Sequence, residues 1–142
     1  VTATQCEFME NGGHGVYCGN VNTKARLNDC IIHHNEGDGL WAYCPAVVVD
    51  LHGTKTAIHS NKGIGIGASG HRGKINIHLP PQHNTSHDNV GEDRCQVGGG
   101  SIANINADGT FTHVLVDDDD DDDDDDGEYG FHQTASSQSF SV

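Results

Sequence analysis

The chain lacks a long apolar segment, a basic stripe and the residue pattern of a helix. Its 142 residues include 7 lysines and arginines against 21 aspartates and glutamates, so binding to nucleic acid is disfavoured because the acidic excess repels phosphates. The absence of any long apolar run excludes insertion into a membrane. Nineteen glycines and the lack of an apolar stripe with helical spacing leave no helix beyond about one turn.

Familiar catalytic and nucleotide-binding motifs are also missing. There is no Ser-His-Asp motif, Walker loop or dinucleotide fingerprint, and the glycine-rich run at 63–67 is followed by neither Lys-Ser/Thr nor a helix. No signal peptide is visible, but the chain does not begin with methionine, so processing or truncation can have removed one. The length suits one domain. The compartment stays open, with the extracellular space or the cell surface as the favoured location.

What the chain does contain is a repeated segment. Residues 6–17 are followed by copies of the same pattern at 30–41 and 56–67 and by a weaker copy at 84–95. Each copy has an asparagine at the same place, and these asparagines are spaced by 24, 26 and 28 residues: Asn11, Asn35, Asn61 and Asn89. A period of about 20–30 residues with strand-like pieces is typical of a solenoid, in which each turn contacts only its neighbours.

The apolar residues of each copy indicate short strands. At the start of the second copy and just before it they fall at Leu27, Cys30 and Ile32, so the alternation changes phase once, as at a bend or bulge between two strands. A second apolar pair follows each asparagine and predicts one buried face. In the fourth copy this pair is displaced by one residue. The pairs are Val16 with Cys18, Leu40 with Ala42, Ile66 with Ala68 and Cys95 with Val97.

Two positions of the repeat have more than one interpretation. The glycine four residues after the asparagine suits a tight corner that needs either positive φ or close approach of the backbone. The asparagines themselves can stack, each amide donating to and accepting from its copy one turn away. Asparagine is also a turn former that tolerates the left-handed conformation. The last two interpretations are compatible, and we predict a structural ladder of Asn11, Asn35, Asn61 and Asn89.

The pattern Cys-x-Phe-x-x-Asn-x-x-x-Gly-Val-Tyr at 6–17, with its relatives at 30–41 and 56–67, resembles the repeat of right-handed parallel β-helices. This repeat occurs in pectin-lyase-like proteins, in carbohydrate-binding and sugar-hydrolase β-helices and in β-helix F-box proteins. The residue pattern of the repeat most resembles that of uncharacterised repetitive β-helix proteins of algae and protists. The resemblance covers about residues 1–110 and implies an all-β, right-handed, single-stranded parallel β-helix. The resemblance gives almost no information about activity, because one fold can carry many functions.

We divide the chain into three parts. Residues 1–116 are expected to form a parallel β-helix of about five turns, a stub about 24 Å long at the normal strand spacing. Residues 117–126 are ten consecutive aspartates, an acidic tract that should stay disordered because its charges repel one another. Residues 127–142 are predicted to form a flexible C-terminal tail. The candidate ligands for loosely bound Ca²⁺, without a defined cage, are Asp117, Asp118, Asp119 and Asp120.

Cysteines and histidines recur at equivalent positions. Cys6 and Cys30 should lie one turn apart, near disulfide range, but we favour free thiols packed as small core residues. Three histidines precede the asparagine by two residues and should stack in an outer column: His33, His59 and His87. Stacked imidazoles can bind a transition metal. We favour a polar position repeated by duplication, because evenly stacked ligands make a poor tetrahedral site.

Two further groups bear on sugar chemistry. Tyr17 and Trp41 are equivalent residues one turn apart, and they offer either an outward aromatic platform for a sugar or ordinary edge packing. Polysaccharide lyases of this fold use clustered acidic calcium ligands with an arginine or lysine base, as the resemblance implies. The one compact cluster of those types lies in the degenerate fourth copy, where Arg94 beside Asp93 reads as a surface pair: Asp88, Glu92, Asp93 and Arg94. We assign no catalytic residue.

The first functional hypothesis rests on the strand edges at the two ends of the solenoid. Strand-like sequence begins at once, without a capping helix, so both ends should present unpaired strand edges. The chain is then either a fragment or a unit that stacks end to end. We expect a non-enzymatic structural and assembly module that self-associates through its open ends and can stack end to end into a fibre. The alternative is a carbohydrate-binding or polysaccharide-lyase-like β-helix fragment with glycans as partners. No cofactor beyond loosely bound Ca²⁺ is expected.

One sequon is present, Asn84-Thr85-Ser86, which permits N-glycosylation in a secreted protein. Asn84 aligns with Cys6 and Cys30, which are predicted to face inward. We therefore expect no glycan at Asn84.

Overall fold

A computed structural model of the chain describes residues 1–80, 83, 85–113 and 139–140. These residues form fifteen β-strands, and no helix occurs among them. Consequently no described element is a helix with the length and apolarity needed to cross a membrane. The expected all-β parallel solenoid is confirmed. The aspartate tract, with Asp117–Asp120, and most of the tail lie outside the described residues.

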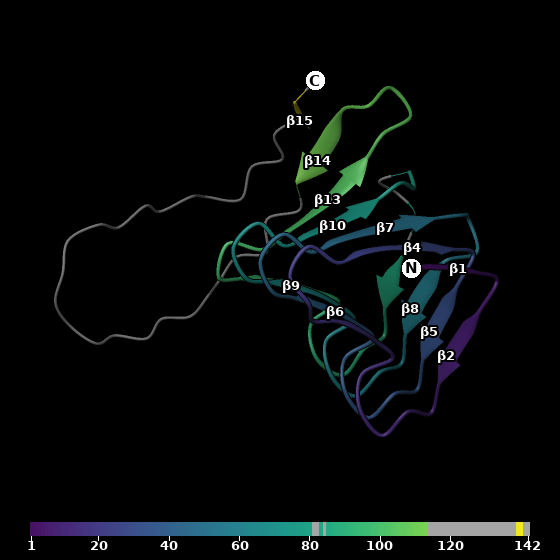
Figure 1. The fold of residues 1–142 in the computed structure, drawn as a ribbon. Coiled ribbons are helices and arrows are strands. Elements are labelled where there is room, and N and C mark those ends of the chain that lie inside the picture. The colour runs from purple at the N-terminus through teal and green to yellow at the C-terminus, as the bar shows by residue number, and fades with distance from the viewer. Residues whose placement is uncertain (81–82, 84, 114–138, 141–142) are drawn as a thin grey trace, which may run out of the picture.

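Each turn of the chain contributes one strand to each of three sheets, which form the walls of a three-sided coil in Figure 1. Sheet A includes β1 (Thr2–Thr4), β4 (Lys24–Asn28), β7 (Val48–His52), β10 (Lys74–Ile77) and β13 (Ser101–Ile105). Sheet B consists of β2 (Glu7–Met9), β5 (Ile31–His33), β8 (Ala57–His59) and β11 (Ser86–His87). Sheet C consists of β3 (Val16–Cys18), β6 (Leu40–Tyr43), β9 (Ile66–Ser69) and β12 (Arg94–Val97). All these neighbouring strands pair in parallel.

The coil completes four turns among the described residues, rather than the five or so expected from the sequence. β13 starts a fifth turn, but the chain then reverses. β14 (Phe111–His113) pairs antiparallel with β13, and β15 (Ser139–Phe140) pairs antiparallel with β14. The reversal extends sheet A, whereas β11 and β12 remain the last strands of sheets B and C.

In-register pairing places like residues in columns that point into the coil. The three sheets contribute the columns Leu27–Leu51–Ile77, Ile32–Ile58 and Leu40–Ile66. Each of these side chains is at most 3% exposed. Burial of one such side chain stabilises the fold by about 1.5–3 kcal/mol. The core is therefore a stack of aliphatic layers, in which every layer covers the one before it.

The end of the core corrects the expected register of the fourth turn. Arg94 pairs with Ile66 and Gln96 with Ala68, so these two residues continue the inner columns. Cys95 and Val97, which were expected there, lie in the outer columns, and that prediction is wrong. The polar side chains are tolerated because they are hydrogen-bonded: Arg94 Nη1 donates to Asn104 Oδ1 (3.0 Å), and Gln96 Oε1 accepts from the backbone N–H of Ile102.

The same contact corrects the interpretation of Arg94 as a surface partner of Asp93. Asn104, which accepts the hydrogen bond from the Arg94 guanidinium, is only 2% exposed. Burial lowers the pKa of Arg94, and the nearby charge of Asp93 opposes that shift. No ion pair joins Arg94 and Asp93 among the described residues. Arg94 instead forms a polar end to the aliphatic stack.

The corner between sheets B and C explains both the recurring glycine and the asparagine. The residues with positive φ are those just before the asparagine, at 54–56°: Glu10, His34, Ser60 and Asp88. The asparagines themselves do not adopt positive φ. A Cβ on Gly39 would lie 2.7 Å from the carbonyl oxygen of Gly65 and 2.8 Å from Asn61 Nδ2. Close approach of successive turns, and not positive φ, therefore requires this glycine.

Candidate functional site

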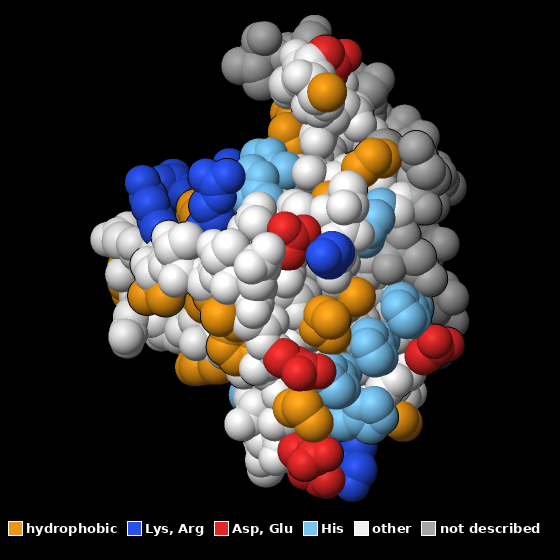
Figure 2. Space-filling model, turned by 90° about the vertical axis from the view of Figure 1, so that its right-hand side faces the viewer, with side chains coloured by type: hydrophobic (Ala, Val, Ile, Leu, Met, Phe, Trp, Pro, Cys, Tyr) orange, Lys and Arg blue, Asp and Glu red, His pale blue; other side chains and the backbone are white. Residues whose placement is uncertain are grey.

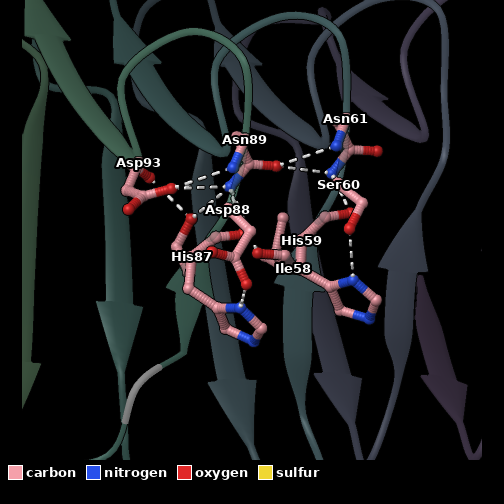
Figure 3. Close-up of polar contacts among 9 residues, drawn as sticks. Ile58, His59, Ser60, Asn61, His87, Asp88, Asn89 and Asp93 are labelled. Atoms are coloured by element: carbon pink, nitrogen blue, oxygen red, sulfur yellow. Dashed lines mark hydrogen bonds and ion pairs between the residues drawn. The ribbon is translucent and has the colours of Figure 1, made fainter.

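The asparagine ladder, formed by Asn11, Asn35, Asn61 and Asn89, runs along this corner. Asn11 Nδ2 donates to Asn35 Oδ1 at 2.8 Å, and Asn35 Nδ2 donates to Asn61 Oδ1 at 2.8 Å. Figure 3 shows the next step, in which Asn61 Nδ2 donates to Asn89 Oδ1 at 2.9 Å. Each accepting oxygen also takes the backbone N–H of the preceding asparagine at 3.1–3.2 Å. Asn35 and Asn61 are fully buried, so these bonds satisfy groups that water does not reach.

The ladder has a direction and two different ends. In each of the three asparagine-to-asparagine bonds, the Nδ2 group donates toward the next turn, whose Oδ1 accepts. The Nδ2 groups of Asn35, Asn61 and Asn89 also donate to a backbone carbonyl of the preceding turn. At the last rung Asn89 Nδ2 donates to Asp93 Oδ1 at 2.9 Å, so Asp93 takes the place of a fifth asparagine (Figure 3). At the first rung Asn11 Oδ1 has no donor among the described residues. The substitution of glycine by Asp93 in the fourth copy therefore closes the ladder on that side.

Tyr17 and Trp41 lie side by side on the outer face of sheet C, as paired residues of β3 and β6. The Trp41 ring lies over Gly67 of the next turn, and the Tyr17 ring lies over Gly19, since a Cβ on either glycine would collide with the ring. Tyr17 is 54% exposed and stacks on His14, with ring centroids 5.5 Å apart. Two aromatic rings thus lie on this face, without a ring contact between them among the described residues.

The predicted histidine column lies on the outer face of sheet B. The rings of His33 and His59 are stacked with centroids 5.2 Å apart, and those of His59 and His87 with centroids 5.1 Å apart. Figure 2 shows a row of histidines with acidic side chains beside it. His33 Nε2 contacts Glu7 Oε1 at 2.6 Å, and His87 Nδ1 contacts Asp88 Oδ2 at 2.8 Å. His33 and His87, at the two ends of the column, are thus each paired with a separate carboxylate. The histidine nitrogens of the column do not converge on one point.

A second histidine group was not predicted. His52 ends β7 and His78 follows β10, and their rings stack with centroids 4.1 Å apart at an interplanar angle of 8°. Asp50, on the same outer face of sheet A, contacts His78 Nε2 at 3.0 Å and accepts a hydrogen bond from Asn76 at 3.0 Å. The signal was available in the sequence, because His52 and His78 repeat at the 26-residue period of the third turn, but they lie outside the asparagine motif.

Electrostatics around Asp50 and His52 favour an ionised carboxylate and a neutral imidazole. Burial raises the pKa of Asp50, but hydrogen bonds from Asn76 and His78, with the charges of both histidines, hold it below the usual value of 3.8. Burial lowers the pKa of His52 below 6.5, as do the charges of His78 and Arg26, and Asp50 opposes this shift.

The remaining predicted groups do not form a site. Asp88 turns to His87, Asp93 to the ladder and Arg94 to the core end, so the acidic cluster of the fourth copy is dispersed. No disulfide joins any of the five cysteines, Cys6 and Cys30 included. The candidate calcium ligands Asp117–Asp120 and the sequon residue Asn84 lie outside the described residues.

Comparisons with protein-family models, with curated proteins and with solved structures find no match to this chain. The structure establishes the fold, a parallel β-solenoid, because the strand pairing stacks turns of three strands each. Functional inference therefore rests on the residues of this chain.

The ladder gives the first prediction. Asn35→Ala removes the donor to Phe8 O and the bonds to both neighbouring asparagines, and we expect a loss of unfolding free energy of at least about 1–3 kcal/mol in urea denaturation. Asn35→Gly should be destabilised as much, because position 35 does not need positive φ. The control is Asn20→Ala, at an exposed turn. A glycine variant as stable as the parent chain would leave asparagine only a turn role.

The histidine column gives a prediction on pH. Burial lowers the pKa of His59, helped by the charges of His87, His33 and His34 and opposed by Asp88. The folded chain therefore binds fewer protons than the unfolded chain below the ordinary pKa of 6.5, so stability falls as pH drops through that value. His59→Gln should flatten the dependence of the melting temperature between neutral and mildly acidic pH. His71→Gln, at an exposed position, should leave it unchanged; equal slopes for both variants would refute the assignment.

Proposed function

We propose that this chain is a non-enzymatic structural module whose function is assembly through the open turn at its N-terminal end. The observation that carries the proposal is the exposure of the first core layer. Ala3, Phe8 and Val16 are only partly buried, although their partners one turn later, Leu27, Ile32 and Leu40, are at most 3% exposed. An apolar layer without a cover gains free energy when a further layer is placed on it.

The backbone of the first turn supports the same conclusion. β1, β2 and β3 are the terminal strands of sheets A, B and C, so each has one edge whose N–H and C=O groups are available for pairing. A second copy of the chain is the occupant that these features suit, since it presents strands of matching length and spacing.

The two ends of the solenoid differ, and this difference favours one mode of assembly. The opposite end carries Arg94 and Gln96 in the inner columns, Asp93 at the end of the ladder and the reversed strand β14. A head-to-tail fibre would place Arg94 against the apolar first layer and leave its charge desolvated. Pairing of two N-terminal ends avoids this cost. It gives a closed dimer, whereas continued stacking into a fibre requires the polar end as well.

A second candidate function is carbohydrate binding by a pectin-lyase-like β-helix. The specific observation in its favour is the pair of outward rings, Tyr17 and Trp41, each in close contact with a glycine. Such rings offer their faces to the apolar faces of sugars. A polysaccharide-lyase-like activity has less support, because the acidic residues of the fourth copy are engaged separately.

Assembly is tested by sedimentation velocity across a wide range of concentration under reducing conditions. We expect the parent chain to form a concentration-dependent dimer and Phe8→Lys to remain monomeric, because the charge would be buried at the joint. The matched control is Val90→Lys at a site that is 80% exposed, which should dimerise normally. Far-ultraviolet circular dichroism checks that both variants keep the fold. A parent chain that is monomeric throughout, or equal losses in both variants, would contradict the proposal.

Sugar binding is tested by calorimetric titration with neutral and acidic oligosaccharides. Loss of one stacked ring costs about 0.5–1.5 kcal/mol or more of binding free energy, so Trp41→Ala and Tyr17→Ala should each weaken binding severalfold. Tyr43→Ala, an exposed aromatic in the neighbouring outer column, serves as the control. No heat with any sugar, or unsaturated products released from an acidic polysaccharide with Ca²⁺, would reject a purely binding role.

A further inference from the structure

Three side chains with metal-binding atoms meet on the outer face of sheet A. The ligand atoms of Asp50, His52 and His78 all lie within 4.8 Å of one another, and no other group of three or more such residues is found in the described part of the chain. They come from consecutive turns: Asp50 and His52 belong to β7, and His78 follows β10. We propose that Asp50, His52 and His78 bind a divalent transition-metal ion of the Zn²⁺ class.

The identity of the donors selects the class of ion. Two imidazole nitrogens and one carboxylate oxygen suit Zn²⁺ and its neighbours Co²⁺, Ni²⁺ and Cu²⁺, whereas Ca²⁺ and Mg²⁺ require mainly oxygen ligands. A tetrahedral zinc ion with bonds of about 2.0–2.1 Å places its ligand atoms about 3.4 Å apart. All three side chains are only partly buried, so small rotations of the rings can close the remaining gap.

The surroundings supply support and an open coordination position. Asn76 Nδ2 donates to Asp50 Oδ1 at 3.0 Å and thereby fixes the carboxylate, as outer groups do in metal sites. His52 and His78 also line a cavity of about 530 Å³, together with Leu79, Pro80, Ile105 and Asn106. A three-ligand ion at the rim of a cavity leaves its fourth position to water or to a small ligand.

The histidine column of sheet B provides the internal contrast. Its rings also stack at 5.1–5.2 Å, but His33 and His87 turn their nitrogens to Glu7 and Asp88 in separate pairs. No three of its donors come within the 4.8 Å that the group of sheet A satisfies. The two arrays therefore share histidine stacking and differ in convergence, which makes the column a matched control.

The test titrates Zn²⁺ into the full chain by calorimetry, with a reductant for the thiols and excess Ca²⁺ to occupy the aspartate tract. We expect a tight step in the titration, in which one zinc ion binds with higher affinity than any other. The double variant H52Q/H78Q should lose this tight step. The matched variant H33Q/H59Q should retain it. D50N should weaken it by about tenfold or more, a loss of the size seen when a metal site is perturbed.

A second readout is independent of stoichiometry. Because the ion joins two consecutive turns, Zn²⁺ should raise the melting temperature of the parent chain and of H33Q/H59Q, but not of H52Q/H78Q. Nitrogen-15 NMR of the imidazoles should show metal-dependent shifts at His52 and His78. The proposal is overturned if both double variants lose the tight step equally, if neither loses it, or if the imidazole shifts fall on other histidines.

Discussion

The hydrogen-bonded asparagine ladder is the constraint on which the rest of this structure depends. Because Asn35 donates to Asn61 and accepts from Asn11, every turn must bring its corner to the same place, within hydrogen-bond distance of the last. That requirement fixes glycine at the close approach after the corner and places the left-handed residue just before the asparagine. Once the corners coincide, the strands pair in register, and the aliphatic side chains stack in columns.

Register also turns repeated residues into surfaces. Histidines two residues before the asparagine become a column, and aromatic residues after it become neighbours on sheet C. The same rule leaves the first and last described turns unlike: a partly buried apolar layer at the first, and Arg94, Gln96 and Asp93 at the last. A solenoid transmits contacts only between neighbours, so its ends and outer columns are where binding can be built without disturbing the core.

The fold and the ladder could be predicted because they lie within the repeated motif itself. The register of the fourth turn could not, because apolar alternation pointed to Cys95 and Val97, whereas Asn104 makes the inward Arg94 tolerable by a long-range contact. The cluster of Asp50, His52 and His78 escaped for a different reason. Its residues lie before the asparagine motif, so the 26-residue spacing of His52 and His78, although present in the sequence, falls outside the columns that the motif aligns.

The most direct test of this account is hydrogen exchange of the asparagine side-chain amides, measured by NMR. Buried amides held by the ladder can exchange only when neighbouring turns separate. The Nδ2 protons of Asn35 and Asn61 should therefore exchange as slowly as the backbone amides of the core strands, while those of the exposed Asn20 and Asn22 exchange rapidly. Fast exchange at Asn35 and Asn61 in a chain whose core strands stay protected would show that the turns are aligned without the ladder.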